Sequence, residues 1–191
     1  MERRPQLTYK FDLPGGEGRL REMVLYVCER CAEAKRFGKV KLNKILWRAD
    51  FTAFAERGLP VTGRSYIKLA AGPAPAEMPP MLAEMESKGL IVFERRELSN
   101  DYVEERPRAL VEPSLRLFSP DDLRFIDSAI SFYWNKSATQ ASELSHRIMW
   151  RSRSFEDPIP YEAVYLSDEK LSEADKIRFA DIARAGQYQS L

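Results

Sequence analysis

The sequence predicts a mainly helical α+β domain, and three observations support this prediction. Apolar residues recur at helical spacing over stretches that end in glycine or proline, such as residues 39–57, which Gly58 and Pro60 follow. Two short β-like runs flank a turn sequence at residues 99–101. The composition, with 44% hydrophobic and 31% charged residues, is typical of a globular chain. We therefore expect a compact helical domain with a small two-stranded β-hairpin.

Length and charge limit the classes of protein to consider. A chain of 191 residues fits one domain, or one domain with an appended helical end. Its net charge of +1 gives no overall attraction to nucleic acid or to an anionic membrane, so any such binding needs a local patch. No run of 18 apolar residues occurs, and the two N-terminal arginines precede no apolar segment. We expect a cytoplasmic protein without a membrane partner.

The N-terminal half reads as an arm followed by two helices. Residues 1–16 contain Pro5 and Pro14 and end in two glycines, which predicts an extended arm. The first helix is expected at residues 17–37, with Gly38 as its C-terminal cap. The second is expected at residues 39–57, and its buried stripe comprises Leu42, Ile45, Leu46, Ala49, Ala53 and Phe54.

The middle of the chain predicts short strands around a third helix. Residues 64–69 are too short for a helix, and the prolines of residues 72–75 forbid one and indicate a turn. A helix is expected at residues 77–88, then strands at 90–93 and 102–111, with Pro107 favouring an edge strand. A helix followed by a hairpin permits a winged-helix-like element. The hairpin charges nearly cancel, which favours a solvated ribbon packed on the helices over a wing that binds phosphates.

Three helix starts mark the C-terminal part. Ser119 precedes a proline and two acids and predicts a helix to about residue 134. Ser137 and Gln140 form a capping box for a helix through about residue 150. After the break at residues 158–160, Ser172 is expected to cap a last helix at residues 173–185. The domain is therefore assigned to residues 17–166, and residues 167–191 to a C-terminal helical extension.

The residues that could carry catalysis or bind metal are few. Cys28 and Cys31 lie on an apolar helical pattern and are interpreted as two reduced thiols, since a zinc site needs two more ligands. The single histidine, His146, is four residues before Trp150 on one helix, which favours a structural contact over a general base or a binding role. No phosphate-binding glycine loop is present. We expect no enzyme activity, no metal and no cofactor.

A basic run is the best candidate for a binding surface. Lys41, Lys44 and Arg48 follow an i, i+3, i+7 spacing beside the apolar stripe, in a stretch without acids. Three interpretations stay open: a solvated helix face, a surface for an acidic protein partner, or a nucleic-acid contact. A second cluster that could join such a surface comprises Arg147, Arg151 and Arg153.

Three motifs occur in order along the chain. The first is KLNKILW at residues 41–47, the second is SYI at 65–67 followed by Gly-Pro at 72–73, and the third is SELSH at 142–146 followed by a tryptophan. Together they resemble the Panacea domain family, also called SocA-like antitoxins, over about residues 20–165. Trp47 stands where a tyrosine is usual, and Arg48 where an apolar or aromatic residue is common. The motif residues are Leu42, Trp47, Tyr66, Gly72, Pro73, Ser142, His146 and Trp150.

The resemblance implies a non-enzymatic antitoxin that binds and neutralises a protein toxin encoded beside it. One branch of the family acts as a proteolytic adaptor that delivers its toxin to a AAA+ protease such as ClpXP, so this is one alternative function. A DNA-binding regulator that uses the hairpin and the Lys41–Arg48 face is the other.

Overall fold

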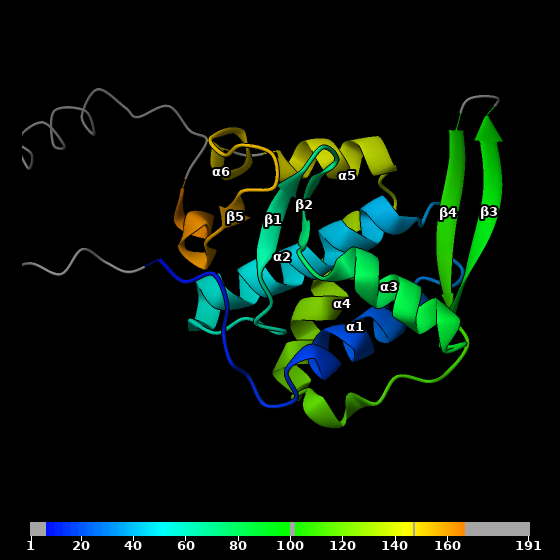
Figure 1. Cartoon of the computed structure of the whole chain (residues 1–191), viewed down its shortest axis with the longest axis horizontal. Coiled ribbons are helices and arrows are strands. Elements are labelled where there is room, and N and C mark those ends of the chain that lie inside the picture. The colour runs from blue at the N-terminus through cyan, green and yellow to red at the C-terminus, as the bar shows by residue number, and fades with distance from the viewer. Residues whose placement is uncertain (1–6, 100–101, 147, 167–191) are drawn as a thin grey trace, which may run out of the picture.

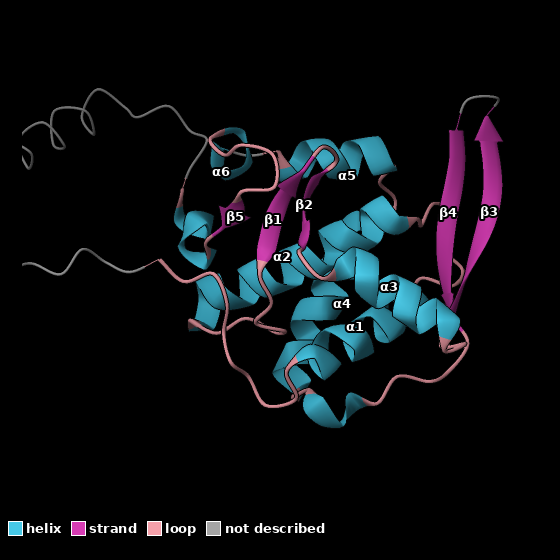
Figure 2. Cartoon of the chain, viewed as in Figure 1, coloured by secondary structure: helices cyan, strands magenta, loops and turns pink. Residues whose placement is uncertain are grey.

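The fold is seen in a computed structural model that describes residues 7–99, 102–146 and 148–166. It is mainly helical with two small antiparallel sheets, which confirms the predicted fold class (Figures 1 and 2). The elements in chain order are α1 (Glu17–Arg30), α2 (Lys39–Arg57), β1 (Tyr66–Leu69), β2 (Gly72–Pro75), α3 (Met78–Ser87), β3 (Ile91–Ser99), β4 (Tyr102–Ala109), η1 (Leu115–Leu117), α4 (Pro120–Tyr133), α5 (Ala138–Ser145), α6 (Ile148–Arg151), β5 (Pro158–Ile159) and η2 (Tyr161–Tyr165).

Helix α2 is the centre of the molecule, and the other elements pack around it (Figure 1). Its bounds agree with the prediction, and Gly58 ends it in the left-handed conformation with its N–H bonded to the Phe54 carbonyl. All six residues of the predicted stripe are buried. Helices α1 and α4 pack against α2, and so do strand β2 and helix α5. None of the described helices is long and apolar enough to cross a membrane.

The sheet beside α2 has the strand order β2-β1-β5. Leu69 pairs with Gly72, so only Ala70 and Ala71 connect β1 to β2. The Gly-Pro segment was expected as a turn, but it forms the strand β2 after a tight two-residue connection. Residues 158–160 were expected only as a break, and their first two residues form β5, which pairs with β1 at Tyr66 and Ile67. Local sequence does not show this pairing, because a two-residue strand depends on its partner.

The second sheet is the β3–β4 hairpin, which follows α3 directly and extends past the helices (Figure 2). Arg106 of β4 is buried against the end of α1, where it donates hydrogen bonds to the carbonyls of Cys31, Ala32 and Ala34. Carbonyls beyond the end of a helix lose their intrahelical partners, and Arg106 supplies a donor to each of these three. The hairpin base is therefore part of the core and not an appendage.

The first helix ends earlier than predicted, and Arg106 lies at this end. The predicted helix of residues 17–37 ends at Arg30, and turns cover the following residues up to the buried Phe37. The backbone N–H of Ala34 bonds to the Cys31 carbonyl, while Arg106 binds that carbonyl from the hairpin. This contact, between residues 75 positions apart, supports the chain where the helix ends, and local periodicity does not reveal it.

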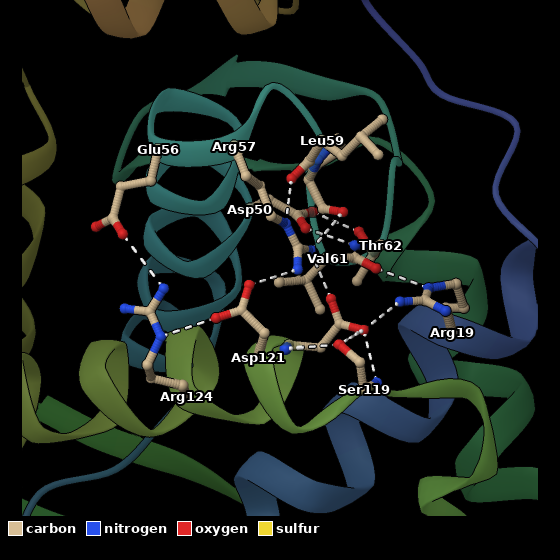
Figure 3. Close-up of polar contacts among 12 residues, drawn as sticks. Arg19, Asp50, Glu56, Arg57, Leu59, Val61, Thr62, Ser119, Asp121 and Arg124 are labelled. Carbon is tan, nitrogen blue, oxygen red and sulfur yellow. Dashed lines mark hydrogen bonds and ion pairs between the residues drawn. The ribbon is translucent and has the colours of Figure 1, made fainter.

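A network of charged groups joins the ends of three helices (Figure 3). Asp122, in the first turn of α4, accepts hydrogen bonds from Arg19 of α1 at 3.1 Å and from Arg57 of α2 at 2.5 Å. Arg19 also donates to the carbonyl of Val61, and the predicted Ser119 cap is present with its capping box. The network connects the segment between α2 and β1 to α4. Its charged side chains lie at the start of α1, the end of α2 and the start of α4, and all three of these helix ends were predicted from the sequence.

A smaller aromatic cluster occupies the side of α2 that faces β5 and η2. Tyr161 stacks on Phe51 with ring centroids 4.8 Å apart, and its hydroxyl donates to the Arg64 carbonyl. Phe11, from the expected N-terminal arm, packs against Tyr161 and bonds through its N–H to the Gly63 carbonyl. The described part of the arm is therefore anchored on the domain. The expected helix at residues 173–185, with its Ser172 cap, lies outside the described residues.

The helix that begins at Ser137 is shorter than predicted. Its Ser137 and Gln140 capping box is present, but the helix ends at Ser145 and not near residue 150. His146 leaves the helical conformation with a ψ of 50°, and α6 begins again at Ile148. After this interruption, Trp150 of the last motif reaches β1, where its indole N–H bonds to the Leu69 carbonyl.

Candidate functional site: the motif cluster at the β1–β2 hairpin

Three segments that are distant in the sequence meet at the β1–β2 hairpin. Lys44 of α2 is 1% exposed, and its Nζ atom donates a hydrogen bond of 2.8 Å to the carbonyl oxygen of Pro73 in β2. On the other side, Ser142 of α5 donates a hydrogen bond of 2.8 Å to the Ala71 carbonyl. The three motifs therefore form one cluster, and a lysine and a serine hold the hairpin from two helices.

Gly72 occupies the closest point of this cluster, and its lack of a side chain is required there. Its φ is +102°, a conformation that disfavours residues with a Cβ atom. A Cβ at this position would lie 2.3 Å from Ser145 Oγ and 2.8 Å from Lys44 Nζ. Both contacts are far shorter than van der Waals separation. The Gly-Pro motif thus allows the backbone of β2 to approach α2 and α5.

The third motif forms a stacked pair beside the hairpin. The rings of His146 and Trp150 are parallel to within 12°, with centroids 3.8 Å apart. Trp150 donates its indole N–H to the Leu69 carbonyl at 3.0 Å, and His146 Nε2 lies 3.2 Å from Ser142 Oγ. This is the structural contact that the sequence predicted: an imidazole bonded at one end and packed on an aromatic ring.

The hydrogen-bond directions argue against a serine–histidine nucleophile pair. The hydroxyl proton of Ser142 is directed to the Ala71 carbonyl, so Ser142 Oγ accepts from an Nε2–H of His146. A general base needs the opposite arrangement, with a free Nε2 lone pair facing the hydroxyl. Burial and the nearby Lys44 ammonium lower the pKa of His146, which keeps the imidazole neutral. The pair therefore supports the fold at this site.

Burial also shifts the ionisation of Lys44. Removal of the ammonium from water lowers its pKa to about 7, and the Pro73 carbonyl is its hydrogen-bond partner. At neutral pH a substantial fraction of this side chain is an uncharged amine. Because Lys44 is also 1% exposed, it does not present its amine to a partner in solution.

The prediction that Lys41, Lys44 and Arg48 form an exposed basic stripe is therefore wrong, because none of the three side chains is fully exposed. Lys41 is only 2% exposed and donates to the Trp134 carbonyl at 3.1 Å. Arg48 is partly buried, with its guanidinium carbon 3.6 Å from the centre of the Phe132 ring. Long aliphatic stems let basic side chains cross apolar surface to reach internal acceptors, which a helical periodicity does not reveal.

The second predicted basic cluster is only partly described. Arg147 lies outside the described residues, whereas Arg151 is exposed and Arg153 is partly exposed. Arg153 follows α6 and accepts a hydrogen bond of 2.7 Å at its carbonyl from Lys68 Nζ. These two arginines therefore lie at the margin of the motif cluster, on the solvent side.

The remaining motif residues are scaffold. Leu42 and Tyr66 are buried, and Trp47 packs on Phe51 with centroids 5.5 Å apart. Tyr66 donates its hydroxyl to Asp50 at 2.8 Å. The motif residues thus belong to two groups. One is the polar cluster at the β1–β2 hairpin, and the other is the aromatic cluster around Phe51 of α2.

Sequence reasoning missed Asp50, a fully buried acid at the end of this scaffold. It accepts hydrogen bonds from the Thr62 N–H at 2.6 Å, the Thr62 hydroxyl and Tyr66. Burial raises its pKa to about 6, although these donors oppose the shift. The only local signal for a buried acid is a single carboxylate within an apolar stripe. Its three hydrogen-bond donors belong to Thr62 and Tyr66, which follow α2 in the sequence.

The two cysteines are free and buried in the main core. Burial raises the pKa of both thiols, that of Cys31 to about 11, so the reactive thiolate form is disfavoured. Cys31 caps the end of α1 and does not lie within the helix. Within residues 7–99, 102–146 and 148–166 no cluster of histidine, cysteine and acidic side chains has the arrangement of a metal site.

The three motifs of this helical domain thus converge on one buried polar cluster. The model of the family described as "Antitoxin SocA-like, Panacea domain" matches residues 42–151 of this chain. The matched segment begins at Leu42 and ends just after Trp150, and it contains every motif residue of the cluster. The chain belongs to the SocA-like antitoxin family with the Panacea domain. No curated protein and no solved structure matches the sequence.

Proposed function

We propose that this protein neutralises a protein toxin encoded beside it by binding the toxin directly, and that both act in the cytoplasm. The observation that carries the proposal is the family match over residues 42–151, because the family is one of antitoxins. The cluster of Lys44, Gly72, Ser142 and His146 supports it, since the matched motifs meet in one hydrogen-bonded cluster in this chain.

We propose further that the domain acts by binding and not by catalysis. His146 Nε2 faces a hydroxyl whose proton is directed elsewhere, and the flat face of the ring is covered by Trp150. Both cysteines are buried with a raised thiol pKa. The groups that most often carry covalent or acid–base chemistry therefore have structural partners here.

The direct test is co-expression with the product of the neighbouring gene in a bacterial host. Induction of the neighbouring gene alone is expected to arrest growth, and simultaneous induction of this protein to restore it, with the two proteins recovered as one soluble complex. A neighbour that is harmless alone, or that stays toxic in the presence of this protein, overturns the proposal. Rescue accompanied by protease-dependent loss of the toxin indicates the adaptor function instead.

A DNA-binding role would have to use the β3–β4 hairpin. Glu104 and Arg106 of the hairpin are buried, and the exposed charges among its described residues are balanced, with Arg108 paired to Glu94. Such a surface offers phosphates little net attraction. The balance of charge therefore favours a protein partner.

A further inference from the structure

A short turn between α6 and β5 exposes a phenylalanine. Phe155 is 61% exposed, although an aromatic ring of this size is normally buried. It lies in the segment that links the third motif to β5, on the side of the molecule away from the β3–β4 hairpin (Figure 1). Among the residues that the structure describes, packing leaves this ring largely uncovered, so the ring is available to a partner.

The turn that carries Phe155 is rigidly bonded to β1. Lys68 donates its backbone N–H to the Asp157 carbonyl at 3.0 Å and accepts from the Glu156 N–H at 2.9 Å. The same residue donates from Nζ to the Arg153 carbonyl at 2.7 Å. Inside the turn, the Ser154 N–H bonds to the Asp157 carboxylate at 2.8 Å. The four residues that flank Phe155, at positions 153, 154, 156 and 157, are therefore all hydrogen-bonded to β1 or within the turn.

The backbone of the turn is also unusual. Glu156 has a φ of +65°, and it is the only residue other than glycine with positive φ in the described part of the chain. Such a conformation costs roughly 1 kcal/mol for a residue with a side chain and persists only where surrounding bonds enforce it. This conformation occurs directly after Phe155, where the chain turns into β5.

The motif cluster supports this turn from below. Lys68 Nζ lies 4.2 Å from the centre of the Trp150 ring, which itself stacks on His146 and bonds to the Leu69 carbonyl. The buried motif, the β1 strand and the turn form one connected unit. The motif cluster is thus connected, through Lys68 and Trp150, to the turn whose backbone carries Phe155.

Charge around the ring points to the chemistry of its partner. Arg151 is exposed and Arg153 partly exposed, and neither forms an ion pair with a described residue. Glu156 is the exposed acid of the turn, whereas the Asp157 carboxylate is bonded to Ser154. The segment around Phe155, residues 151–156, therefore carries one exposed arginine, one partly exposed arginine and one exposed acid. A pocket with an apolar floor and carboxylates at its edge complements this surface.

We infer that Phe155 is the anchor by which this protein binds its toxin, and that its ring inserts into an apolar pocket of the toxin whose acidic rim pairs with Arg151 and Arg153. The inference rests on the proposed antitoxin function and names the surface that carries it. Buried aromatic anchors contribute most of the affinity at protein interfaces, and rim charges accelerate association. A pre-ordered turn adds to affinity because little conformational freedom is lost on binding.

The test is the dissociation constant between the purified full chain and the neighbouring-gene product, measured by calorimetry. Phe155→Ala is expected to weaken binding by about 10-fold or more, and Phe155→Trp to retain it. Leu110→Ala removes an apolar side chain that is 58% exposed and follows β4 at the other side of the molecule, so its affinity should equal that of wild type. The unfolding temperature of each variant shows that the fold is intact.

The outcomes separate this inference from the proposed function. Wild-type binding with an unchanged affinity for Phe155→Ala overturns the inference and leaves the antitoxin function standing. Absence of wild-type binding overturns both. A photo-reactive benzoylphenylalanine placed at position 155 should cross-link to the toxin, and one at position 110 should not. Phe155-dependent binding of a single-stranded oligonucleotide, without an effect on toxin binding, also contradicts the inference, because an exposed ring with arginines can stack on bases.

Discussion

The Nζ atom of Lys44 lies 2.8 Å from the carbonyl oxygen of Pro73, and this hydrogen bond joins the first family motif to the second. Lys44 looks like a surface base in the sequence, yet the structure uses it as an internal tie between the central helix and a β-hairpin. The amine therefore experiences a low-polarity environment, which has a measurable consequence for pH dependence.

Lys44→Met should change how stability depends on pH. The folded-state pKa of Lys44 is lowered to about 7 from the usual 10.5, so between these values the unfolded chain binds more protons than the folded one. Wild-type stability should thus rise with pH across this window, by at most about 1.4 kcal/mol per pH unit from this group. The methionine variant should lack that contribution. Urea unfolding of both proteins between pH 7 and pH 10 measures it, and parallel pH profiles would contradict the assignment.

Gly72→Ala should destabilise the domain by about 3 kcal/mol, because an unfavourable φ and two clashes act together. Gly58 provides the matched control, since its φ is +74° and nothing lies near the added Cβ atom. Gly58→Ala should cost only about 1 kcal/mol. Thermal and urea unfolding give both values. Equal costs at the two positions would show that the contacts of Gly72 with Lys44 and Ser145 are unimportant.

Arg106→Met should remove the donors for three carbonyls after α1 and lower the free energy of unfolding by about 3 kcal/mol or more. Arg108, two residues further along β4, is exposed and paired with Glu94, so Arg108→Met should change stability by less than about 1 kcal/mol. Amide hydrogen exchange provides a local readout. The last turn of α1 should exchange faster in Arg106→Met, and unchanged protection there would argue against this account of where the helix ends.

Asp50→Asn tests the buried acid, whose contribution to stability should change with pH in the direction opposite to that of Lys44. The folded-state pKa of Asp50 is raised to about 6 from the usual 3.8, so its ionisation disfavours the folded state. Wild-type stability should fall from this group as the pH rises from about 4 to about 6, by about 3 kcal/mol in total, and then level off. Asp50→Asn should not show the fall.

Asp121→Asn serves as the control for that measurement. The Arg124 side chain, with Arg57, lowers the pKa of Asp121 on the surface, so this acid favours the folded state when ionised. Its contribution is present at neutral pH and is lost as the pH decreases. Asp121→Asn should therefore not reproduce the effect of Asp50→Asn between pH 4 and pH 6. If the two variants behaved alike, burial would not be the cause of the Asp50 shift.

Elements with local signals were predicted well from the sequence. The bounds of α2 follow from its apolar period and from Gly58, and α4 and α5 begin at the predicted serine caps. The helix-then-hairpin order of residues 78–109 is also present. These features depend on caps, breakers and periodicity within a few residues, which a single sequence contains.

Features set by distant contacts were not predicted. The early end of α1 depends on Arg106, and strand β5 exists only through its pairing with β1. The burial of Lys41 and Lys44 depends on the carbonyls of Trp134 and Pro73, which lie far away in the sequence. The motifs identified Lys44, Ser142 and Trp150 as part of the family pattern. The structure shows what these side chains do: they donate hydrogen bonds to the carbonyls of the β1–β2 hairpin.

The central claim is that this domain inactivates a co-encoded toxin by stoichiometric binding. The most direct measurement is a titration of the activity of the purified toxin with the purified full chain, without protease and without ATP. Toxin activity should fall linearly to zero at a fixed molar ratio, and Phe155→Ala should require a large excess to reach the same point. Full toxin activity in the presence of excess wild-type protein would contradict the claim.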